Sequence, residues 1–426
     1  MTIDHIAIRP GDADYDEART TKAGTAEPAI VLRPRTPEEV AASISHARGE
    51  GIPLAIRSGG HNALGFGNVD DGVVIDVSQL DQVDLLGDGR VRIGAGATWG
   101  PAAAALAEHG LAITSGDTTS VGVGGLTQAG GIGWMVRKHG LTIDSLLAAE
   151  VVTAAGDVVR ASATENADLF WALRGGAGNF GVVTAFEFQA QQVSTVHYGT
   201  ISFELDDVAQ LLKSWSAAMR SAPDELSTTL ALMPAFGDFP AGAMLFACLD
   251  AEDASALEPL RTIGTVVAED ISERPYAEIL EEAGPPPGVL PVVGNTLVET
   301  VDEPLIEAIA TAYAAGGRIA FLRSLGGAFG RVDREETAFA HRGAEALVVS
   351  AAFLPEDATD DQIAEAHAVW RTIGDQGVGS YAGFLGRDTA DDIATLWPAD
   401  TLERLRQVKR TWDPENIFRR NFNVAP

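Results

Sequence analysis

The sequence of 426 residues has little cysteine and no long apolar run. Cys248 is its single cysteine, which excludes an internal disulfide and a cysteine-ligated metal cluster. No apolar stretch reaches the ~20 residues that a membrane-spanning helix needs. The opening residues, MTIDHIAIRP, lack the basic and apolar regions of a signal peptide. We therefore expect a cytoplasmic protein with no membrane segment.

Positive charge is also scarce, because 60 acidic residues outnumber 30 Lys and Arg and give a net charge of -30. Lysine occurs at Lys22, Lys138, Lys213 and Lys409. A field of this sign repels phosphates, so we expect neither nucleic acid nor an anionic membrane as a partner. Two explanations of the acidity stay open, adaptation to high salt and an ordinary solvated surface.

Several common catalytic motifs are missing from the sequence. It contains no G-x-x-x-x-G-K-[ST], no H-E-x-x-H and no G-x-S-x-G, so no P-loop, zinc site or hydrolase elbow is indicated, and we expect no metal. Gly176, Gly178 and Gly181 do spell G-x-G-x-x-G. A helical pattern precedes them and a strand pattern follows, which is the reverse of the dinucleotide-binding arrangement.

The length predicts two domains, and the pattern of the chain changes near residue 190. Before that point, β-type runs at 72–80 and 89–98 alternate with helical patterns at 36–48 and 98–110, which predicts an α+β unit. After it, the pattern predicts an antiparallel sheet backed by helices. The expected strands are 197–205, 228–234, 242–250, 318–325 and 345–353, and the expected helices are 207–219, 252–263, 302–315 and 360–373. The proline-rich segment 281–291 is expected to be a loop or lid.

Two glycine-rich loops are the most informative feature that is present. They are RSGGHNALGFGN at 57–68 and SGDTTSVGVGGLTQAGGIGW at 115–134. Glycine permits a positive φ and lets the backbone approach a ligand closely. Successive backbone N–H groups can then bind an anion without lysine. Tight turns in a small sheet are the alternative, but two such loops, one of them carrying His61, favour ligand binding.

The order of these motifs resembles the berberine-bridge-enzyme-like flavin oxidases of the vanillyl-alcohol-oxidase superfamily, especially bacterial members of the 6-hydroxy-D-nicotine-oxidase type. The resemblance rests on I-R-S-G-G-H, V-G-V-G-G-x-x-x-x-G-G-x-G and R-K-x-G-L-x-x-D, together with segments 170–184, 324–342 and 408–424. It covers nearly the whole chain. It implies an α+β, two-domain fold, with a PCMH-type FAD-binding domain at 1–190, completed by 405–426, and a substrate domain at 191–404.

The resemblance also implies how FAD is held. His61 stands where the family bonds covalently to the flavin 8α-carbon. In the family's G-x-C-x-[TS]-V-G segment, Thr118 takes the place of the cysteine that forms a second bond, so we expect one histidyl link and no cysteinyl link. Leu126 replaces a histidine often found there, and Val121 occupies the expected oxygen-access position. The other expected cofactor-binding residues are Arg57, Ser58, Gly59, Gly60, Asn62, Gly65, Gly116, Gly122, Gly125, Thr127, Gly130, Gly131, Gly133, Val183, Asn421 and Asn423.

The catalytic side is less determined by the sequence. The family's Y-x-N-[YF] stretch corresponds to Tyr381-Ala382-Gly383-Phe384, so Tyr381 is either the base or a packing residue. Arg323, on the strand before Gly326 and Gly327, is expected either to bind an anionic or carbonyl-bearing substrate or to form a salt bridge at the pocket rim. His341 is expected to make a structural hydrogen bond.

The implied activity is oxidation of a small alcohol, amine or phenolic substrate, with O2 as acceptor and hydrogen peroxide as product. A dehydrogenase using another acceptor and a catalytically silent flavin-binding protein stay open as alternatives. A homodimer is also left open.

Overall fold

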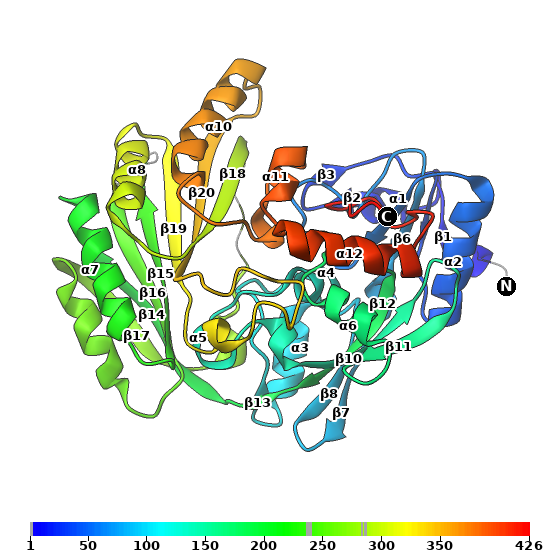
Figure 1. The fold of residues 1–426 in the computed structure, drawn as a ribbon, viewed down its shortest axis with the longest axis horizontal. Coiled ribbons are helices and arrows are strands. Elements are labelled where there is room, and N and C mark those ends of the chain that lie inside the picture. The colour runs from blue at the N-terminus through cyan, green and yellow to red at the C-terminus, as the bar shows by residue number, and fades with distance from the viewer. Residues whose placement is uncertain (1–2, 236–240, 283, 285–287) are drawn as a thin grey trace.

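The structure is a computed structural model that describes residues 3–235, 241–282, 284 and 288–426. Two lobes lie side by side (Figure 1). The N-terminal lobe contains a four-stranded and a five-stranded sheet, and the second lobe is built on a seven-stranded sheet. The chain changes lobe between β13 (Gln191–Gln192) and β14 (Thr195–Phe203). The domain limits expected from the sequence stay a prediction.

The four-stranded sheet has the order β1 (Ala7–Ile8), β4 (Ile30–Leu32), β6 (Val73–Asp76), β5 (Leu54–Arg57). Helix α2 (Pro37–Glu50) connects β4 to β5. Both strands pair with β6, which lies between them, and both pairings are parallel. At the start of α2, the Thr36 side chain accepts a hydrogen bond from the backbone N–H of Glu39. At its end, Gly51 adopts a φ of +67° and terminates the helix. The expected strand 72–80 stops at Asp76, because the Asp76 carboxylate accepts from the backbone of Ser78 and turns the chain into a short 3₁₀ helix.

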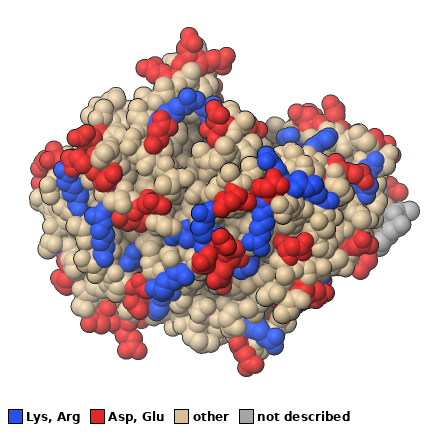
Figure 2. Space-filling model, viewed as in Figure 1, with Lys and Arg blue, Asp and Glu red and all other residues tan. Residues whose placement is uncertain are grey.

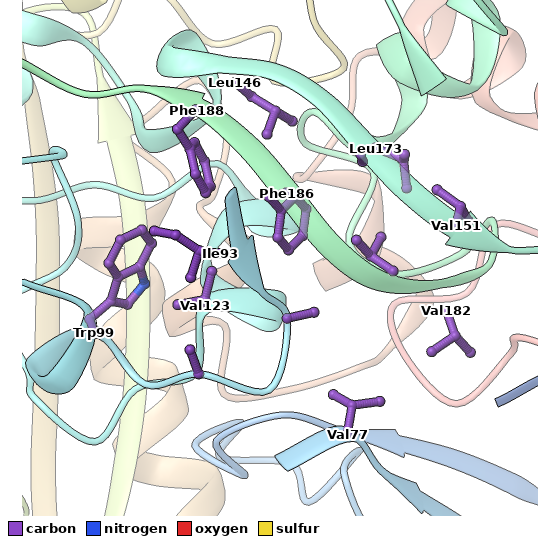
Figure 3. Close-up of a cluster of buried hydrophobic side chains, with 14 of the residues drawn as sticks. Val77, Ile93, Trp99, Val123, Leu146, Val151, Leu173, Val182, Phe186 and Phe188 are labelled. Atoms are coloured by element: carbon purple, nitrogen blue, oxygen red, sulfur yellow. The ribbon is translucent and has the colours of Figure 1, made fainter. Parts of the chain in front are cut away.

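The five-stranded sheet is antiparallel, with the order β11 (Val158–Ser162), β10 (Leu146–Val152), β12 (Val182–Gln189), β8 (Arg90–Gly94), β7 (Val83–Gly87). Phe186 and Phe188 are two residues apart and therefore lie on the same face of β12. They pack with Ile93, Trp99 and Val123 (Figure 3). Trp99 begins α3 (Trp99–Ala107) and Val123 begins α4 (Val123–Ala129). The core therefore supports the second glycine loop directly at Val123, near the middle of the loop.

The seven-stranded sheet confirms the expected antiparallel sheet backed by helices. Its order is β17 (Val266–Pro275), β14, β16 (Gly242–Leu249), β15 (Leu226–Met233), β19 (Arg318–Ser324), β20 (Ala346–Pro355), β18 (Val289–Val298). Helices α7 (Val208–Ser221) and α8 (Glu303–Ala314) pack on one face through residues such as Trp215 and Ile309. Helix α10 (Asp360–Gly374) rises beside β18 and β20 (Figure 1).

Three details of this lobe differ from the sequence expectations. Strand β17 was not expected, because its mostly exposed, charged sequence becomes a strand only by pairing with β14. The prediction of a loop at 281–291 is wrong for its last residues, because β18 begins at Val289 and pairs with β20. Residues 283 and 285–287 of this segment lie outside the described residues. The expected helix 252–263 is a 3₁₀ helix (Ala254–Thr262), since Pro259 inside it has no N–H to donate.

The surface carries few isolated cations. Figure 2 shows Lys and Arg mostly beside Asp and Glu on the face it presents. Of the helices in the described ranges, none has the length and apolar character needed to cross a membrane.

The C-terminal segment returns to the N-terminal lobe, where α12 (Ala399–Trp412) packs against α6 (Ala167–Leu173). Lys409 and Asp413 are fully buried, and Lys409 Nζ lies 2.6 Å from Asp413 Oδ2. The same ammonium donates to the carbonyls of Asn179 at 2.7 Å and Phe418 at 3.0 Å. Burial lowers the pKa of Lys409, while Asp413 opposes that shift. This ion pair fixes the last residues of the chain against segment 176–184.

We expect Lys409→Met to lower the free energy of unfolding by about 3–5 kcal/mol, because it leaves the Asp413 carboxylate buried without its cation. Urea unfolding followed by tryptophan fluorescence measures the loss. Arg410→Met is the matched control, since Arg410 lies one residue away on the exposed side of α12 and pairs only with the exposed Glu403. Equal losses in the two variants would contradict the role given to the buried pair.

Candidate active site

The two glycine-rich loops touch through their backbones. A Cβ atom on Gly59 would lie 2.3 Å from the backbone nitrogen of Gly122, and one on Gly122 would lie 2.1 Å from Ser58 Oγ. Real Cβ atoms do not approach other atoms this closely, so both positions need glycine. Ser58 Oγ also donates to the carbonyl of Ala95 at 2.7 Å, which ties the first loop to the five-stranded sheet. The loops therefore meet at one fixed point.

The second loop is folded equally tightly on itself. A Cβ on Gly133 would lie 1.4 Å from the carbonyl oxygen of Ser115, and one on Gly131, at φ +81°, would lie 2.0 Å from Thr142 Oγ1. Gly130 has φ +125° and packs on Phe339, while Gly116 packs on Leu126. These glycines shape the loop, and Gly125 has open space beside it.

The first loop holds its own shape through local hydrogen bonds. Asn62 Oδ1 accepts from the backbone of Leu64 at 3.0 Å, and the carbonyl of Asn62 accepts from Gly65. Gly60 and Gly65 have φ values of +68° and +67°. Arg57 is buried, with one guanidinium nitrogen 2.9 Å from Asp76 Oδ2. The same nitrogen donates to the carbonyl of Ala18 at 2.6 Å, so these polar contacts of Arg57 lie within the N-terminal lobe and do not involve the second loop.

Buried polar atoms without a protein partner gather around these loops. Buried polar groups in folded proteins are almost always hydrogen-bonded, so such a group indicates a missing polar partner. Within the described part of the chain, the unpartnered atoms include Arg57 Nη1, Thr114 Oγ1, Ser115 Oγ, Thr127 Oγ1, Asn421 Oδ1 and Asn423 Oδ1. The C-terminal members lie beside the loops, because Phe422 packs on Phe66 with ring centroids 5.2 Å apart. Asn421 also donates to the carbonyl of Gly178 at 3.1 Å. The set suits a large polar ligand such as FAD.

His61 lies where the loops meet. Its Nε2 is 2.7 Å from Ser120 Oγ of the second loop. Burial lowers the pKa of His61, the charge of Lys22 acts in the same direction, and Glu282 and Ser120 oppose the shift. The half-buried ring is therefore neutral near pH 7, which leaves one nitrogen with a free electron pair.

Glu282 reaches this point from the segment before β18. Its carboxylate accepts hydrogen bonds from Ser120 Oγ at 2.6 Å, Thr119 Oγ1 at 2.9 Å and Lys22 Nζ at 2.9 Å. These bonds, with that of Ser120 the strongest, lower the pKa of Glu282 to about 2. Nothing in the sequence singled out this residue, because it lies within the expected loop 281–291.

Arg323 of β19 is buried and forms an ion pair across the two lobes with the half-buried Asp117. Its Nη2 lies 2.6 Å from Asp117 Oδ2 in the second loop, and its Nε donates to Thr229 Oγ1 at 3.0 Å. The guanidinium carbon also sits 4.9 Å from the centre of the Trp134 ring. Burial opposes the ionisation of Asp117, but the charge and hydrogen bond of Arg323 outweigh it and lower the pKa of this carboxyl. Arg323 therefore forms a salt bridge, but it is buried rather than exposed at a rim. A role in substrate binding stays a prediction.

Aromatic side chains surround this ion pair. Tyr198 packs edge-on against Trp134 with ring centroids 5.2 Å apart. Burial raises the pKa values of both Tyr198 and Tyr276, so their phenols are neutral at pH 7. No motif contains Tyr198 or Tyr276, and only the fold brings them here. Asp117 lies at an unspecified position of the G-x-C-x-[TS]-V-G segment, which did not indicate its pairing with Arg323.

Tyr381 is buried in a separate apolar cluster with Ile132, Leu141 and Phe339. Its backbone N–H donates to Asn295 Oδ1 at 2.7 Å. A Cβ on Gly383 would lie 2.5 Å from the Tyr381 ring, which explains why glycine stands there. Burial raises the pKa of Tyr381 to about 12. The phenol is consequently neutral near pH 7, and a tyrosinate base would have to form against this shift.

The remaining expected residues have structural contacts. Thr118 Oγ1 donates to Asp117 Oδ1 at 3.1 Å, and the carbonyl of the half-buried Val121 accepts from Trp99. Val183 is buried on β12. His341 makes its expected structural hydrogen bond, with Nε2 lying 3.2 Å from each of two carbonyl oxygens at Thr395 and Leu396.

A cavity of about 390 Å³ lies elsewhere, between α7 and the 3₁₀ helix 254–262. Its lining includes Leu226, whose side chain faces α7, whereas Thr229 and Arg323 point to the other face of the sheet. This cavity is therefore separate from the loops. Among the described residues, no group of three or more His, Cys, Asp or Glu could hold a metal ion.

Two family models match the regions that form the site. The FAD binding domain matches residues 28–162, and the model described as berberine and berberine like matches residues 381–425. These ranges contain both glycine loops, Tyr381 and the C-terminal asparagines. The G-x-G-x-x-G at 176–181 lies between α6 and β12, which confirms that it does not open a helix.

Whole-chain comparisons agree with these models. The chain is 30% identical to the uncharacterized FAD-linked oxidoreductase YgaK of Bacillus subtilis, over 97% of this chain and 95% of that protein. It is 29% identical to (R)-6-hydroxynicotine oxidase of Paenarthrobacter nicotinovorans, over 100% and 98% of the two chains.

Solved structures with similar folds include two oxidases. The 6-hydroxy-D-nicotine oxidase of Arthrobacter nicotinovorans superposes with a TM-score of 0.87 at 27% identity, over 100% and 98% of the two chains. The glucooligosaccharide oxidase of Acremonium strictum, described with 6-S-cysteinyl, 8α-N1-histidyl FAD, shares the fold with a TM-score of 0.84 at 23% identity, over 99% and 97% of the chains. The chain therefore belongs to the FAD-linked oxidoreductases, within the berberine-bridge-enzyme-like flavin oxidases.

Proposed function

We propose that this protein is an FAD-linked oxidase that holds FAD through one covalent bond from His61 and oxidises a small uncharged amine. The observation that carries the proposal is the meeting of the two glycine loops, where a neutral His61 lies against Ser120. In this proposal, residues 1–190 with 405–426 bind FAD, and residues 191–404 cover the substrate.

The residues around the loops suit FAD. Thr127, Asn421 and Asn423 offer buried oxygen atoms that lack a partner among the described residues. The backbone N–H groups of the loops can bind a pyrophosphate even though the chain has a net charge of -30. When bound, FAD supplies two-electron chemistry, accepting hydride at N5 and returning the electrons to O2.

A single histidyl bond agrees with the chain's nucleophiles. The glucooligosaccharide oxidase carries both a cysteinyl and a histidyl bond, as its description states. Here Thr118 occupies the position of the family cysteine, and a threonine hydroxyl does not replace a thiolate. Cys248 is buried on β16, and burial raises the pKa of its thiol. His61 is thus the residue that remains for attachment.

The charges around Arg323 favour an uncharged substrate. Asp117 already neutralises the guanidinium, so an anionic substrate would have to compete with a half-buried carboxylate at 2.6 Å. Trp134 and Tyr198 beside the pair present flat apolar surfaces. The relatives include a 6-hydroxynicotine oxidase and a chitooligosaccharide oxidase.

The state of Tyr381 favours an amine over an alcohol. Oxidation of an alcohol needs a base to remove the O–H proton, and a base contributes most when its pKa is near the working pH. The pKa of Tyr381 is raised to about 12, so little tyrosinate is present at pH 7. A neutral amine can lose hydride without such a base. Tyr381 then acts by position and shape.

Acid precipitation tests the bond to His61. We expect the yellow colour of the wild-type protein to stay in the pellet, with a mass increase of one FAD per chain. His61→Ala should release all flavin to the supernatant, because the nucleophile is gone. Cys248→Ser is the control and should retain the colour. Release of flavin from the wild-type protein would contradict the proposed attachment.

The loop contact has a separate test. We expect Gly59→Ala to cost about 1–3 kcal/mol of stability, the range for atoms forced into a packed site, and to reduce the FAD content of purified protein. Gly49→Ala on α2 is the control, since its new Cβ meets nothing within 4 Å and alanine favours a helix. Thermal melting and the flavin-to-protein absorbance ratio measure both effects. Full FAD content in Gly59→Ala would refute the need for close contact.

Turnover of a panel of small amines and secondary alcohols, followed by peroxide release, tests the substrate class and the acceptor. We expect Tyr381→Phe to retain amine oxidation within about tenfold and to leave the pH profile unchanged below pH 9, because a phenol with a pKa of about 12 does not titrate there. A loss of about 10²–10⁴-fold would instead identify Tyr381 as the base. Reduced flavin that persists in air would identify a dehydrogenase.

A further inference from the structure

A chain of hydrogen bonds connects three distant segments at His61. His61 Nε2 lies 2.7 Å from Ser120 Oγ, and Ser120 Oγ donates to Glu282 Oε1 at 2.6 Å. Lys22 Nζ, 2.9 Å from the same carboxylate oxygen, holds it from the other side. The first loop supplies the imidazole, the second supplies the hydroxyl, and the segment before β18 supplies the carboxylate.

The direction of these bonds follows from the number of protons available. The pKa of Glu282 is lowered to about 2, so its carboxylate has no proton and can only accept. Ser120 has one hydroxyl proton, which points to Glu282. The Ser120 oxygen must therefore accept the second bond, and Nε2 of His61 must donate it. The neutral ring consequently carries its proton on Nε2 and its free electron pair on Nδ1.

We propose that Ser120 and Glu282 are positioning residues that hold His61 in the Nε2–H tautomer, so that Nδ1 is the atom that bonds to FAD. This inference rests on the covalent attachment proposed above and adds the residues that prepare it. Attachment through Nδ1 agrees with the N1-histidyl bond of the glucooligosaccharide oxidase. In the part of the chain that the structure describes, Nε2 is the ring nitrogen that lies within hydrogen-bond distance of Ser120 Oγ.

The attachment balances with O2 as the oxidant. A bond forms between Nδ1 and the flavin 8α-carbon, and one C–H bond of that methyl group breaks. Two electrons pass into the flavin and then to O2. One proton comes from the methyl group and the other is the Nε2 proton of His61, so one hydrogen peroxide is formed per attachment. As Nδ1 is alkylated, positive charge develops on the ring, and Glu282 stabilises it through Ser120.

The carboxylate acts through its charge rather than as a strong base. Its side chain is 46% exposed and that of Lys22 is 57% exposed, so the released proton can pass to water. Thr119 also donates to Glu282, at 2.9 Å, but His61 bonds to Ser120 instead. Thr119 is therefore the matched control position.

The rate of attachment tests the proposal. Full-length protein from riboflavin-limited cells is mixed with FAD in air, and acid-stable flavin is followed with time. We expect Ser120→Ala and Glu282→Gln to slow attachment by about 10- to 100-fold, as when a partner that orients an imidazole is removed from a metal site. Ser120→Thr keeps the hydroxyl and should restore the rate, and Thr119→Val should match the wild-type protein. Non-covalent FAD binding should change less than threefold in every variant.

The protonation site of the His61 ring is a second measurement. It would not change if Ser120 and Glu282 had a merely structural role. In FAD-free protein labelled with ¹⁵N-histidine, the wild-type His61 signals should be those of a ring protonated at Nε2, with His61→Ala used for assignment. Ser120→Ala should shift the ring toward a mixture of tautomers, whereas Thr119→Val should not.

The possible outcomes distinguish failure of the positioning role from failure of the proposed covalent attachment. Attachment at the wild-type rate in Ser120→Ala and Glu282→Gln, or a wild-type His61 protonated at Nδ1, would overturn the positioning role alone. Wild-type protein without acid-stable flavin would refute the proposed attachment and the positioning role together, and it is recognised without any variant. If Ser120→Ala does not fold, the exposed Glu282→Gln carries the test.

Discussion

The backbone contact between Gly59 and Gly122 is the constraint on which the site depends. His61 follows Gly59 by two residues and Ser120 precedes Gly122 by two, so the point where the loops touch also sets the 2.7 Å separation of the imidazole and the hydroxyl. A side chain at either glycine would push the loops apart and break this contact. The glycines thus bring His61, the proposed nucleophile, to its hydrogen-bond partner and shape the proposed cradle for the cofactor.

Two ion pairs, one fully buried and one half-buried, maintain the surroundings of this contact in different ways. Lys409 and Asp413 lie in the C-terminal segment and hold Asn421 and Asn423 beside the loops. Arg323 and Asp117 join the seven-stranded sheet to the second loop and cancel each other's charge where substrate is expected. The first pair is a matter of stability, since its atoms are fully buried. The second sets which charges the site can accept.

Much of the fold was predictable because it depends on local patterns. The Thr36 cap, the Gly51 stop and the alternating strands β14, β15, β16, β19 and β20 all follow from residue order. Strand β17 was missed because its sequence is charged and exposed, and pairing with β14 alone makes it a strand. Strand β18 was missed because prolines precede it. Glu282 went unnoticed because it lies in the same expected loop, although it accepts hydrogen bonds from the hydroxyls of Thr119 and Ser120 in the second loop.

The sequence by itself determined the cofactor class, the candidate nucleophile His61 and the threonine at position 118, because glycine spacing and residue identity are local properties that a motif records. Only the tertiary structure decided the chemical state of these groups. The neutrality of His61 and Tyr381, the proton on Nε2 of His61 and the engagement of Arg323 by Asp117 arise from burial and from neighbours that are remote in the chain. A pKa or a hydrogen-bond direction depends on which charges and dipoles surround a group in space. No single segment of the sequence contains that information.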